Sequence, residues 1–427
     1  MGRPRLPLVL LGILCVLSLG ARAAWLPEPC RSPCRSASAR VLIFDERYYV
    51  NAARVIAGIR PLPGSPYASS PLGDDPNSEH PQLVKLLIAG SIELFGDDPF
   101  AWRVGSLIAG TLAILGMFAL VRAAGGGPWT ALAAAALMAA DNLMIVHGRI
   151  GTLDIYALAA MVWGAALYLR RRPLAAGVVI GVGLAAKLVA GYVLIALALL
   201  ELLRWLRGRR RGAVPAWRFG GCLTAAAGVF IGLLALFDRI APPYDPLARK
   251  LVGGGVFGHV GHMLSYAAQQ TSPAGPRGIA SYPWGWLVDY KPIVYLNVDP
   301  AHPAPGLYHV HPAVHFLGLI SPPILLLALP ALALACWTVL RGRERPGTEL
   351  PLLAAAWFAG AYLPFVLLSL IGQRTSYLYY MLVVMPALYV AVAWLLPRLL
   401  RWPRLTLLWA VCVVAAAVIA YPFTPLP

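Results

Sequence analysis

Two adjacent carboxylates and several aromatic rings follow the first apolar segment of the chain. Asp45-Glu46 is preceded by Phe44 and followed by Tyr48-Tyr49. A carboxylate in this place can accept a proton from a hydroxyl group, while the aromatic rings can stack on a sugar. The plainer alternative is a solvated acid pair at the start of a helix, where the helix dipole favours negative charge. Asp45 and Glu46 are therefore candidate catalytic residues.

A second group of ionisable residues surrounds a predicted helix start. Pro81 suits the first turn of a helix because its φ angle is fixed. Glu79 and His80 then lie at the positive end of that helix, and Lys85 lies about one turn inside it. These three residues are candidates for substrate binding. The alternative is a capping acid followed by an amphipathic surface helix, with Lys85 snorkelling toward water.

A third motif, Asp141-Asn142 to Asp154, joins two apolar segments and contains Arg149. Ionisable groups close to hydrocarbon are costly and indicate a functional site. The planar guanidinium of Arg149 can bind a phosphate through two hydrogen bonds. The alternative is an Arg149–Asp154 ion pair that only ties two membrane spans together.

Two further basic residues, Lys187 and Arg374, fall at the predicted outer ends of spans. Basic residues there oppose the positive-inside trend, so they need a partner. An anionic lipid phosphate would supply one, and snorkelling without a role in binding is the alternative. We include both residues, with Asp154, among the candidates for binding the donor phosphate or substrate.

Histidines and cysteines give weaker indications. His309, His311 and His315 resemble a metal-binding spacing, but the first two share a face only in a strand and the last two only in a helix. We therefore expect no metal, and no cofactor besides the substrate itself. Cys30 and Cys34 flank a Pro-rich turn, where a disulfide and two free thiols are equally compatible with the sequence.

The composition indicates what must position these residues. Of 427 residues, 59% are hydrophobic and 12% are charged, against about 45–50% and about 25% in soluble domains. This balance excludes a soluble globular enzyme and a disordered protein. The net charge of +17 is interpreted as topogenic charge on the cytoplasmic side rather than as a nucleic-acid site. The sequence predicts an all-α polytopic membrane protein.

About eleven transmembrane helices are predicted from the apolar segments. They cover 6–20, 100–121, 128–146, 152–169, 174–188, 190–206, 217–237, 313–340, 350–371, 376–396 and 405–422. Residues 1–23 are either a cleaved signal peptide or the first span, and we favour the span because the chain continues as a multi-span protein.

The Arg-rich short loops at 170–172, 204–211, 341–343 and 398–404 place the N-terminus inside. Two outer loops follow from this topology: 27–99, which carries the acid motif, and 238–312. A short helix is expected at 46–60, and amphipathic interfacial helices are expected at 81–96 and 245–268. We interpret 1–427 as a single integral-membrane domain.

The motifs, taken in this order, resemble those of the dolichyl- and polyprenyl-phosphate-mannose protein mannosyltransferases. The resemblance rests on Phe44-Asp45-Glu46, Glu79-His80-Pro81 with Lys85, Asp141-Asn142 with Arg149 and Asp154, Ala186-Lys187, Pro283-Trp284-Gly285-Trp286 and Tyr377-Leu378-Tyr379-Tyr380-Met381. It covers about residues 40–390.

The resemblance implies the GT-C glycosyltransferase fold, in a multi-pass protein of the cell membrane with its active site outside. The enzyme would move a sugar, mannose in that family, from a polyprenyl phosphate to a Ser/Thr hydroxyl of a protein. Inversion of the anomeric carbon and no need for a metal are also implied. Asp45 would be the base, and Arg149, Lys187 and Arg374 would be candidates for the donor phosphate. The expected partners are the polyprenyl-phosphate sugar, an acceptor and membrane lipids, without nucleic acid.

Departures from the family pattern leave the acceptor open. Arg47-Tyr48-Tyr49 replaces the usual His-Phe-Gly, and Gln82 and Val84 replace a Pro and a Gly. The same chemistry on a lipid or cell-wall glycan acceptor is the first alternative. A lipid or sugar transporter or flippase is a more distant one, because such folds tend to show inverted repeats that this sequence lacks.

Overall fold

The computed structural model describes residues 5–28, 30–31, 41–208, 216–298, 307–308, 314–342 and 349–424. Its larger helices are α1 (Arg5–Ala23), α3 (Leu83–Phe95), α4 (Pro99–Ala123), α5 (Pro128–Ala140), α7 (Asp154–Leu169), α8 (Pro173–Ala186), α9 (Tyr192–Leu206), α10 (Ala216–Ile240), α11 (Gly255–Gln269), α13 (Pro322–Arg341), α14 (Leu350–Ile371), α15 (Met381–Leu399) and α16 (Pro403–Ile419). Shorter helical segments are α2 (Glu46–Ile56), α6 (Asn142–His147), η2 (Leu188–Gly191), α12 (Pro283–Trp286) and η3 (Leu378–Tyr380).

The strands form three small antiparallel pairs. They are β1 (Cys30–Arg31) with β5 (Leu307–Tyr308), β2 (Tyr244–Asp245) with β3 (Lys250–Leu251), and β4 (Ile293–Val298) with β6 (Val314–Gly318). None closes into a barrel, so the helices alone determine the architecture of the described chain.

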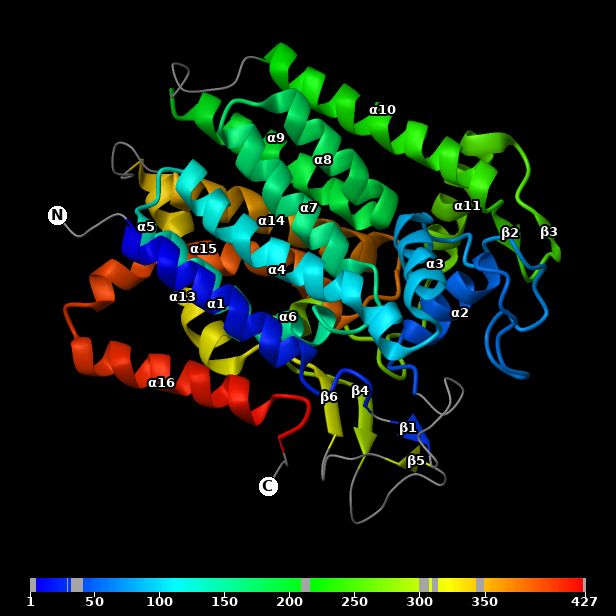
Figure 1. The fold of residues 1–427 in the computed structure, drawn as a ribbon. Helices are drawn as coiled ribbons and strands as arrows, with labels where there is room; N and C mark the ends of the chain where they lie inside the picture. The colour runs from blue at the N-terminus through cyan, green and yellow to red at the C-terminus, as the bar shows by residue number, and fades with distance from the viewer. Residues whose placement is uncertain are drawn as a thin grey trace.

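The long helices run side by side in one bundle, with α15 almost completely buried and α16 at the periphery (Figure 1). Helix α8 packs closely on α10 because two of its contact positions are glycine. A Cβ at Gly177 would lie 2.3 Å from the Cys222 carbonyl oxygen, and one at Gly181 would lie 2.7 Å from the Ala226 carbonyl oxygen. Small residues at helix contacts are typical of membrane bundles, where lipid supplies no hydrophobic drive.

The segments between the long helices gather at one end of the bundle. Figure 1 shows α2, α3, α11 and the three strand pairs there, while α1 begins at the opposite end. Helices α2 and α3 pack on each other, and α3 packs on α4. The end with α2 and α3 holds the candidate site, and the bundle supports it from one side.

The predicted spans agree closely with the apolar helices. Among the described residues, seven helical segments are long and apolar enough to cross a bilayer, including α1, α4, α10 and α15. Four shorter apolar helices, α5, α7, α8 and α16, coincide with the other four predicted spans. The protein is therefore an all-α multi-pass membrane protein.

Several predicted boundaries are wrong. The span predicted at 313–340 begins as strand β6, and its helix starts only at Pro322 because residues 314–318 pair with β4. The span at 128–146 is interrupted at Asp141, whose side chain accepts a hydrogen bond from the Leu143 amide and caps α6. The surface helix predicted at 245–268 starts at Gly255, after the β2–β3 pair.

Candidate functional site

Asp45 lies at the start of α2, and its carboxylate has no hydrogen-bond or ion-pair partner among the residues that the structure describes. Its backbone is helical (φ −72°, ψ −7°), and its side chain makes no capping hydrogen bond to α2. The side chain is partly buried. Burial raises the pKa of Asp45 from 3.8 to about 6, Lys187 and Arg47 oppose this rise, and Asp154 adds to it. A carboxylate with a pKa near neutrality suits a general base.

Lys187 and Asp154 form a buried ion pair beside Asp45, with Nζ 2.7 Å from Oδ1 of Asp154. Helix α8 ends at Ala186 because Lys187 adopts an extended backbone (φ −159°, ψ 133°). The Lys187 ammonium also lies 5.4 Å and 5.7 Å from the ring centres of Tyr379 and Tyr380. The fold thus brings the first and third motifs, the later lysine and the Tyr-rich segment together.

Glu46, the neighbour of Asp45 in the sequence, is fully buried. Its two oxygens accept hydrogen bonds from Nε and Nη2 of Arg103 at 2.7 and 2.8 Å. They also accept hydrogen bonds from the backbone amides of Ile43 at 2.7 Å and Gly151 at 2.8 Å. Each oxygen of the Glu46 carboxylate thus accepts two hydrogen bonds. Glu46 therefore fixes the start of α2 against α4 and the α6–α7 turn. Sequence reasoning missed Arg103, because it lies within an apolar helix without a recognisable motif.

Lys85 is enclosed by the loop that precedes α3. Its Nζ lies 2.5 Å from Oδ2 of Asp75 and donates to the carbonyl oxygens of Asn77 at 2.5 Å and His80 at 2.8 Å. The side chains of Lys85 and Asp75 are both fully buried. The three ammonium hydrogens are therefore used within the loop, and the snorkelling alternative is wrong. Asp75 was also missed, since nothing in its sequence context distinguishes it from other loop acids.

Glu79 and His80 lie on the surface of the same loop and are partly buried. Asn77 donates from Nδ2 to Oε1 of Glu79 at 2.7 Å and to the Tyr67 hydroxyl at 3.0 Å. Burial raises the pKa of Glu79. Burial, together with Lys187, Lys85 and Arg374, lowers the pKa of His80 well below its usual value, so His80 is neutral at pH 7. Its ring lies against Tyr49, 5.9 Å between centres.

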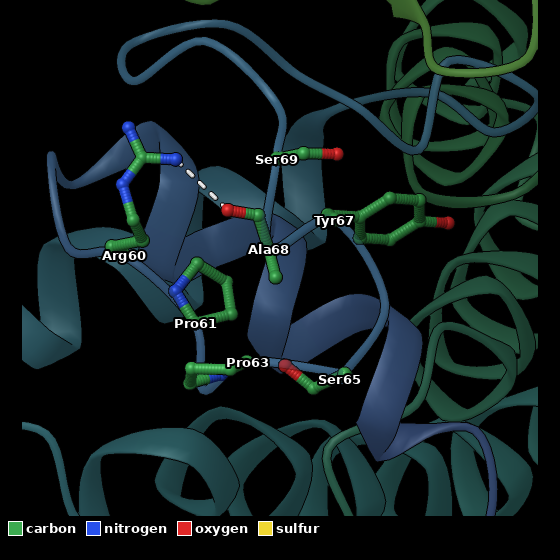
Figure 2. A pocket seen from close by; sticks show the side chains of 8 residues that line it. Arg60, Pro61, Pro63, Ser65, Tyr67, Ala68 and Ser69 are labelled. Carbon is green, nitrogen blue, oxygen red and sulfur yellow. Dashed lines mark hydrogen bonds between the residues drawn. The ribbon is translucent and has the colours of Figure 1, made fainter.

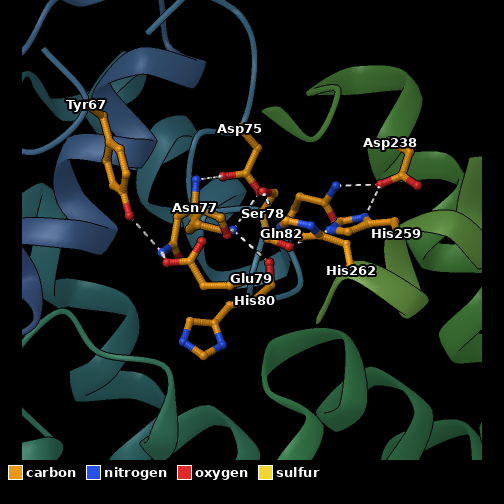
Figure 3. A network of polar contacts seen from close by, with 11 residues as sticks. Tyr67, Asp75, Asn77, Ser78, Glu79, His80, Gln82, Asp238, His259 and His262 are labelled. Atoms are coloured by element: carbon orange, nitrogen blue, oxygen red, sulfur yellow. Dashed lines mark hydrogen bonds and ion pairs between the residues drawn. The ribbon is translucent and has the colours of Figure 1, made fainter. Parts of the chain in front are cut away.

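A polar network ties this loop to α10 and α11 (Figure 3). The buried His259 ring joins Oδ1 of Asp238, at 2.7 Å, to the Ser78 carbonyl oxygen, at 2.9 Å. Gln82 donates to the same Asp238 oxygen at 2.6 Å. The His80 ring points away from these contacts in Figure 3. The sequence marked His259 only as one of several loop histidines, and only the fold shows its position.

Arg149 is not brought into the Asp45 group. Its Nη2 donates to the Ala24 carbonyl oxygen at 2.9 Å, and its guanidinium lies over the rings of Phe316 and Phe423, at 5.3 and 4.6 Å. The alternative Arg149–Asp154 pair is also not formed, because Asp154 bonds to Lys187. The tight turn between α6 and α7 directs Arg149 toward the end of α1.

Arg374 contacts the end of α11. Its Nη1 donates to the Ala267 carbonyl oxygen, and Arg374 forms an antiparallel bridge with Thr271. Both contacts hold the end of α11 against the segment that follows α14. The charge of Arg374 contributes to the lowered pKa of His80. The charge of Arg374 therefore acts on His80, whose ring lies against Tyr49 of α2.

An open pocket of about 470 Å³ lies in the outer loop at residues 60–69. Arg60 crosses it to donate from Nη1 to the Ala68 carbonyl oxygen at 2.8 Å (Figure 2). Tyr67 lines this pocket and also bonds to Asn77 of the neighbouring loop. The pocket thus adjoins the loop that carries Glu79 and His80.

Metal ligation has no candidate in the described part of the chain, where no three His, Cys, Asp or Glu side chains are grouped as a metal would require. His309 and His311 lie outside the described residues, and so does Cys34. The side chain of Cys30 is likewise not described. The predicted spacing of the three histidines and the disulfide question therefore stay as predictions.

Comparison with known proteins gives consistent matches. Residues 79–233 match the model of the dolichyl-phosphate-mannose-protein mannosyltransferase family. The chain is 24% identical over 403 residues to a polyprenol-phosphate-mannose–protein mannosyltransferase of Corynebacterium glutamicum, covering 81% of this chain and 75% of that protein. A protein of the same name from Mycolicibacterium smegmatis is 26% identical over 426 residues, covering 85% and 78%.

Among solved structures, the Saccharomyces cerevisiae protein O-mannosyltransferase Pmt1-Pmt2 complex bound to the sugar donor superimposes with a TM-score of 0.67. The sequence identity is 12%, and the match covers 98% of this chain and 90% of that chain. This likeness establishes the GT-C fold. The resemblance inferred from the six motifs is confirmed by the family and sequence matches.

Proposed function

We propose that this chain, a GT-C protein similar to the polyprenol-phosphate-mannose–protein mannosyltransferases, is itself such an enzyme. It takes mannose from a polyprenyl phosphate and transfers it to a Ser/Thr hydroxyl of a protein, on the outer face of the cell membrane. The observation that carries the proposal is the carboxylate of Asp45, which has no partner in the described part of the chain and lies beside the buried Lys187–Asp154 pair.

The reaction is one displacement. Asp45 accepts the proton of the acceptor hydroxyl as that oxygen attacks the anomeric carbon. The bond between the anomeric carbon and the phosphate oxygen breaks, and the polyprenyl phosphate leaves with the bonding electrons. A single displacement inverts the configuration at the anomeric carbon. A pKa of about 6 keeps most of Asp45 ionised at pH 7 and therefore ready to accept a proton.

The leaving phosphate needs a positive charge that is fixed before the reaction. Lys187 is best placed among the predicted candidates, because its ammonium faces Asp154, Tyr379 and Tyr380 and influences Asp45. Arg374 supplies a second charge at the rim of the same region. Both are proposed to act on the donor phosphate.

Three other candidates receive different roles in this proposal. Glu46 positions the start of α2 through Arg103, because its oxygens are already saturated. Lys85 shapes the loop that carries Glu79 and His80, because its ammonium is enclosed. Arg149 stabilises the contact between the α6–α7 turn and the end of α1.

The outer orientation follows from the charge of the loops. Arg170, Arg171 and Arg172 lie in the short connection between α7 and α8, at the opposite end of α7 from Asp154. Short Arg-rich connections stay in the cytoplasm. Asp45 and Asp154 then face outside, where the acceptor would be a secreted or surface protein.

The experiment is transfer by purified protein from polyprenyl-phosphate mannose to a Ser/Thr-containing peptide, with a lipid acceptor and a glycan acceptor assayed in parallel. The proposal expects mannosylated peptide from the wild type and none from Asp45→Asn. Transfer to lipid or glycan alone would replace the protein acceptor by the alternative predicted from Arg47-Tyr48-Tyr49. No transfer to any acceptor from any polyprenyl-phosphate sugar would reject the enzyme.

A further inference from the structure

The residue before Asp45 has a backbone conformation that needs support. Phe44 lies in the left-handed region, with φ of +54°. This conformation is strained for a bulky residue, so surrounding contacts must hold it there. The backbone of Phe44 leads directly into Asp45, the N-cap residue of α2. The position of the Asp45 carboxylate therefore depends on this turn.

Two rings from distant parts of the chain hold the Phe44 side chain. Tyr295 of β4 stacks on it, with 4.1 Å between ring centres and 20° between planes. Tyr379 of η3 meets it edge to face, at 5.6 Å and 78°. Tyr295 and Tyr379 are both buried. Phe44 is thus fixed between the outer-loop sheet and the Tyr-rich segment.

Tyr295 is directed toward Phe44 by an irregularity in the sheet. Val294 pairs with Leu317 and Leu296 pairs with Phe316, so Tyr295 is the extra residue of a β-bulge. Bulges re-aim a side chain and are frequent beside active sites. The neighbouring Gly318 leaves room for the phenol, since a Cβ there would lie 2.5 Å from its oxygen.

The Tyr295 hydroxyl is anchored to the α6–α7 motif. It lies 2.9 Å from Nε2 of His147, whose Nδ1 lies 3.3 Å from Oγ1 of Thr152. His147 is fully buried. Burial, with Asp154 and Asp45 nearby, raises the pKa of Tyr295 well above its usual value, so the phenol keeps its proton and can donate to His147.

We propose that Tyr295 and His147 form a clamp that sets the position of Asp45 by holding Phe44 in its left-handed conformation. Both are positioning residues, because they act through Phe44. The inference rests on the proposed function only in taking Asp45 as the base. Its consequence is that the outer loop 238–312, through β4, controls the geometry of the catalytic carboxylate. Misplacement of a reacting group by about 1 Å can lower a rate about 100-fold.

Three variants test the clamp. Tyr295→Phe keeps the ring stack and removes the bond to His147. Tyr295→Leu removes the stack, and Gly318→Ala leaves Tyr295 intact but displaces its phenol. The matched controls are Tyr290→Phe, at a mostly exposed tyrosine of the same loop, and Gly232→Ala, where an added Cβ would meet nothing within 4 Å.

We expect kcat for mannosyl transfer to fall about three- to tenfold in Tyr295→Phe and about 100-fold in Tyr295→Leu and Gly318→Ala. The KM for the donor should stay within about twofold of the wild type, because the clamp does not touch the donor phosphate. The acid limb of the kcat–pH profile should move to lower pH in Tyr295→Leu, since a less enclosed Asp45 has a lower pKa. Both controls should behave as the wild type.

A second measurement does not depend on activity. In an Asp45→Cys background, the rate at which a water-soluble maleimide labels the new thiol reports how enclosed position 45 is, after subtraction of labelling without that cysteine. Tyr295→Leu should raise this rate, whereas Tyr290→Phe should not. If Tyr295→Leu fails to fold, Tyr295→Phe and Gly318→Ala decide the question.

The inference is overturned if every clamp variant has the same kcat, the same pH profile and the same labelling rate as the wild type. The proposed function would be unaffected by that result. A fall in the amount of folded protein, with unchanged kcat per folded molecule, would overturn the inference as well. An inactive wild type whose position 45 still responds to Tyr295→Leu would reject the proposed function and support the clamp.

Discussion

Replacement of Asp45 by Asn separates a catalytic role from a structural one. The amide keeps the size of the side chain but cannot accept a proton at neutral pH. General-base catalysis contributes about 10²–10⁴-fold, so kcat for mannosyl transfer should fall by at least that factor. This fall corresponds to about 2.7–5.5 kcal/mol of lost transition-state stabilisation.

Stability should change in the opposite direction. The folded-state pKa of Asp45 is raised from 3.8 to about 6, so ionisation is harder in the folded than in the unfolded protein. This carboxylate therefore lowers stability as pH rises from about 4 to about 6, and the loss persists at pH 7. The full shift corresponds to about 3 kcal/mol, and partial exposure reduces this to about 1–2 kcal/mol. Asp45→Asn should unfold at a temperature equal to or slightly above the wild type.

The assay is single-turnover transfer together with thermal unfolding in the same detergent. Wild-type kcat/KM should fall about tenfold per pH unit below pH 6 and level off above it, because only the ionised carboxylate accepts a proton. Glu46→Gln is the matched control. It weakens the pairing of buried Arg103 and should lower the unfolding temperature, with a smaller loss of kcat per folded molecule.

Near-normal kcat in Asp45→Asn, combined with loss of kcat in a well-folded Glu46→Gln, would show that the two roles are reversed. Retention of kcat in both variants would refute the catalytic reasoning altogether. The acid motif would then be only a feature of the helix start.

Four further outcomes are expected. Lys187→Met should lower kcat/KM for the donor about 10–100-fold, measured by varying polyprenyl-phosphate mannose, because a fixed charge near the leaving phosphate is lost. Lys85→Met should reduce the free energy of unfolding by about 3–5 kcal/mol, because Asp75 is left buried without its partner, while the donor KM of folded protein stays unchanged. Chelator treatment should leave activity intact, and activity lost and restored by added metal would contradict this. A cysteine at Tyr290 should be labelled from outside the cell and one at Arg171 only after permeabilisation; the reverse pattern would invert the topology.

The sequence was sufficient for the class of protein and for the number of apolar helices. An apolar stretch must become a helix in a membrane, since lipid offers no partner to the backbone groups. For this reason eleven apolar helices appear among the described residues, and eleven spans were predicted. The motif order was also sufficient to identify the family resemblance, because each motif is local and readable without a fold.

Helix ends were harder to predict from the same signal. Residues 314–318 are apolar enough to continue a span, yet they pair with β4 in the outer loop. Asp141 interrupts a predicted span because its Oδ1 accepts hydrogen bonds from the backbone amides of Leu143 and Ser321. Hydropathy measures how apolar a segment is, but it contains no information about the hydrogen-bonding partners of the segment. It therefore cannot separate an apolar strand or an interrupted helix from a continuous membrane-spanning helix.

Only the tertiary structure decided which charged side chains form ion pairs with one another. Asp45 and Glu46 were both candidates from the sequence, and the family resemblance implied Asp45 as the base without showing how the two differ. In the structure Arg103, 57 residues from Glu46 along the chain, pairs with Glu46, whereas Asp45 has no such partner among the described residues. Lys85 and Lys187 were candidates of the same kind from the sequence, yet Asp75 pairs with the first and Asp154 with the second. An ion pair forms between side chains that the packing of helices brings within about 3 Å, and residue spacing within a motif carries no information about a partner on another helix.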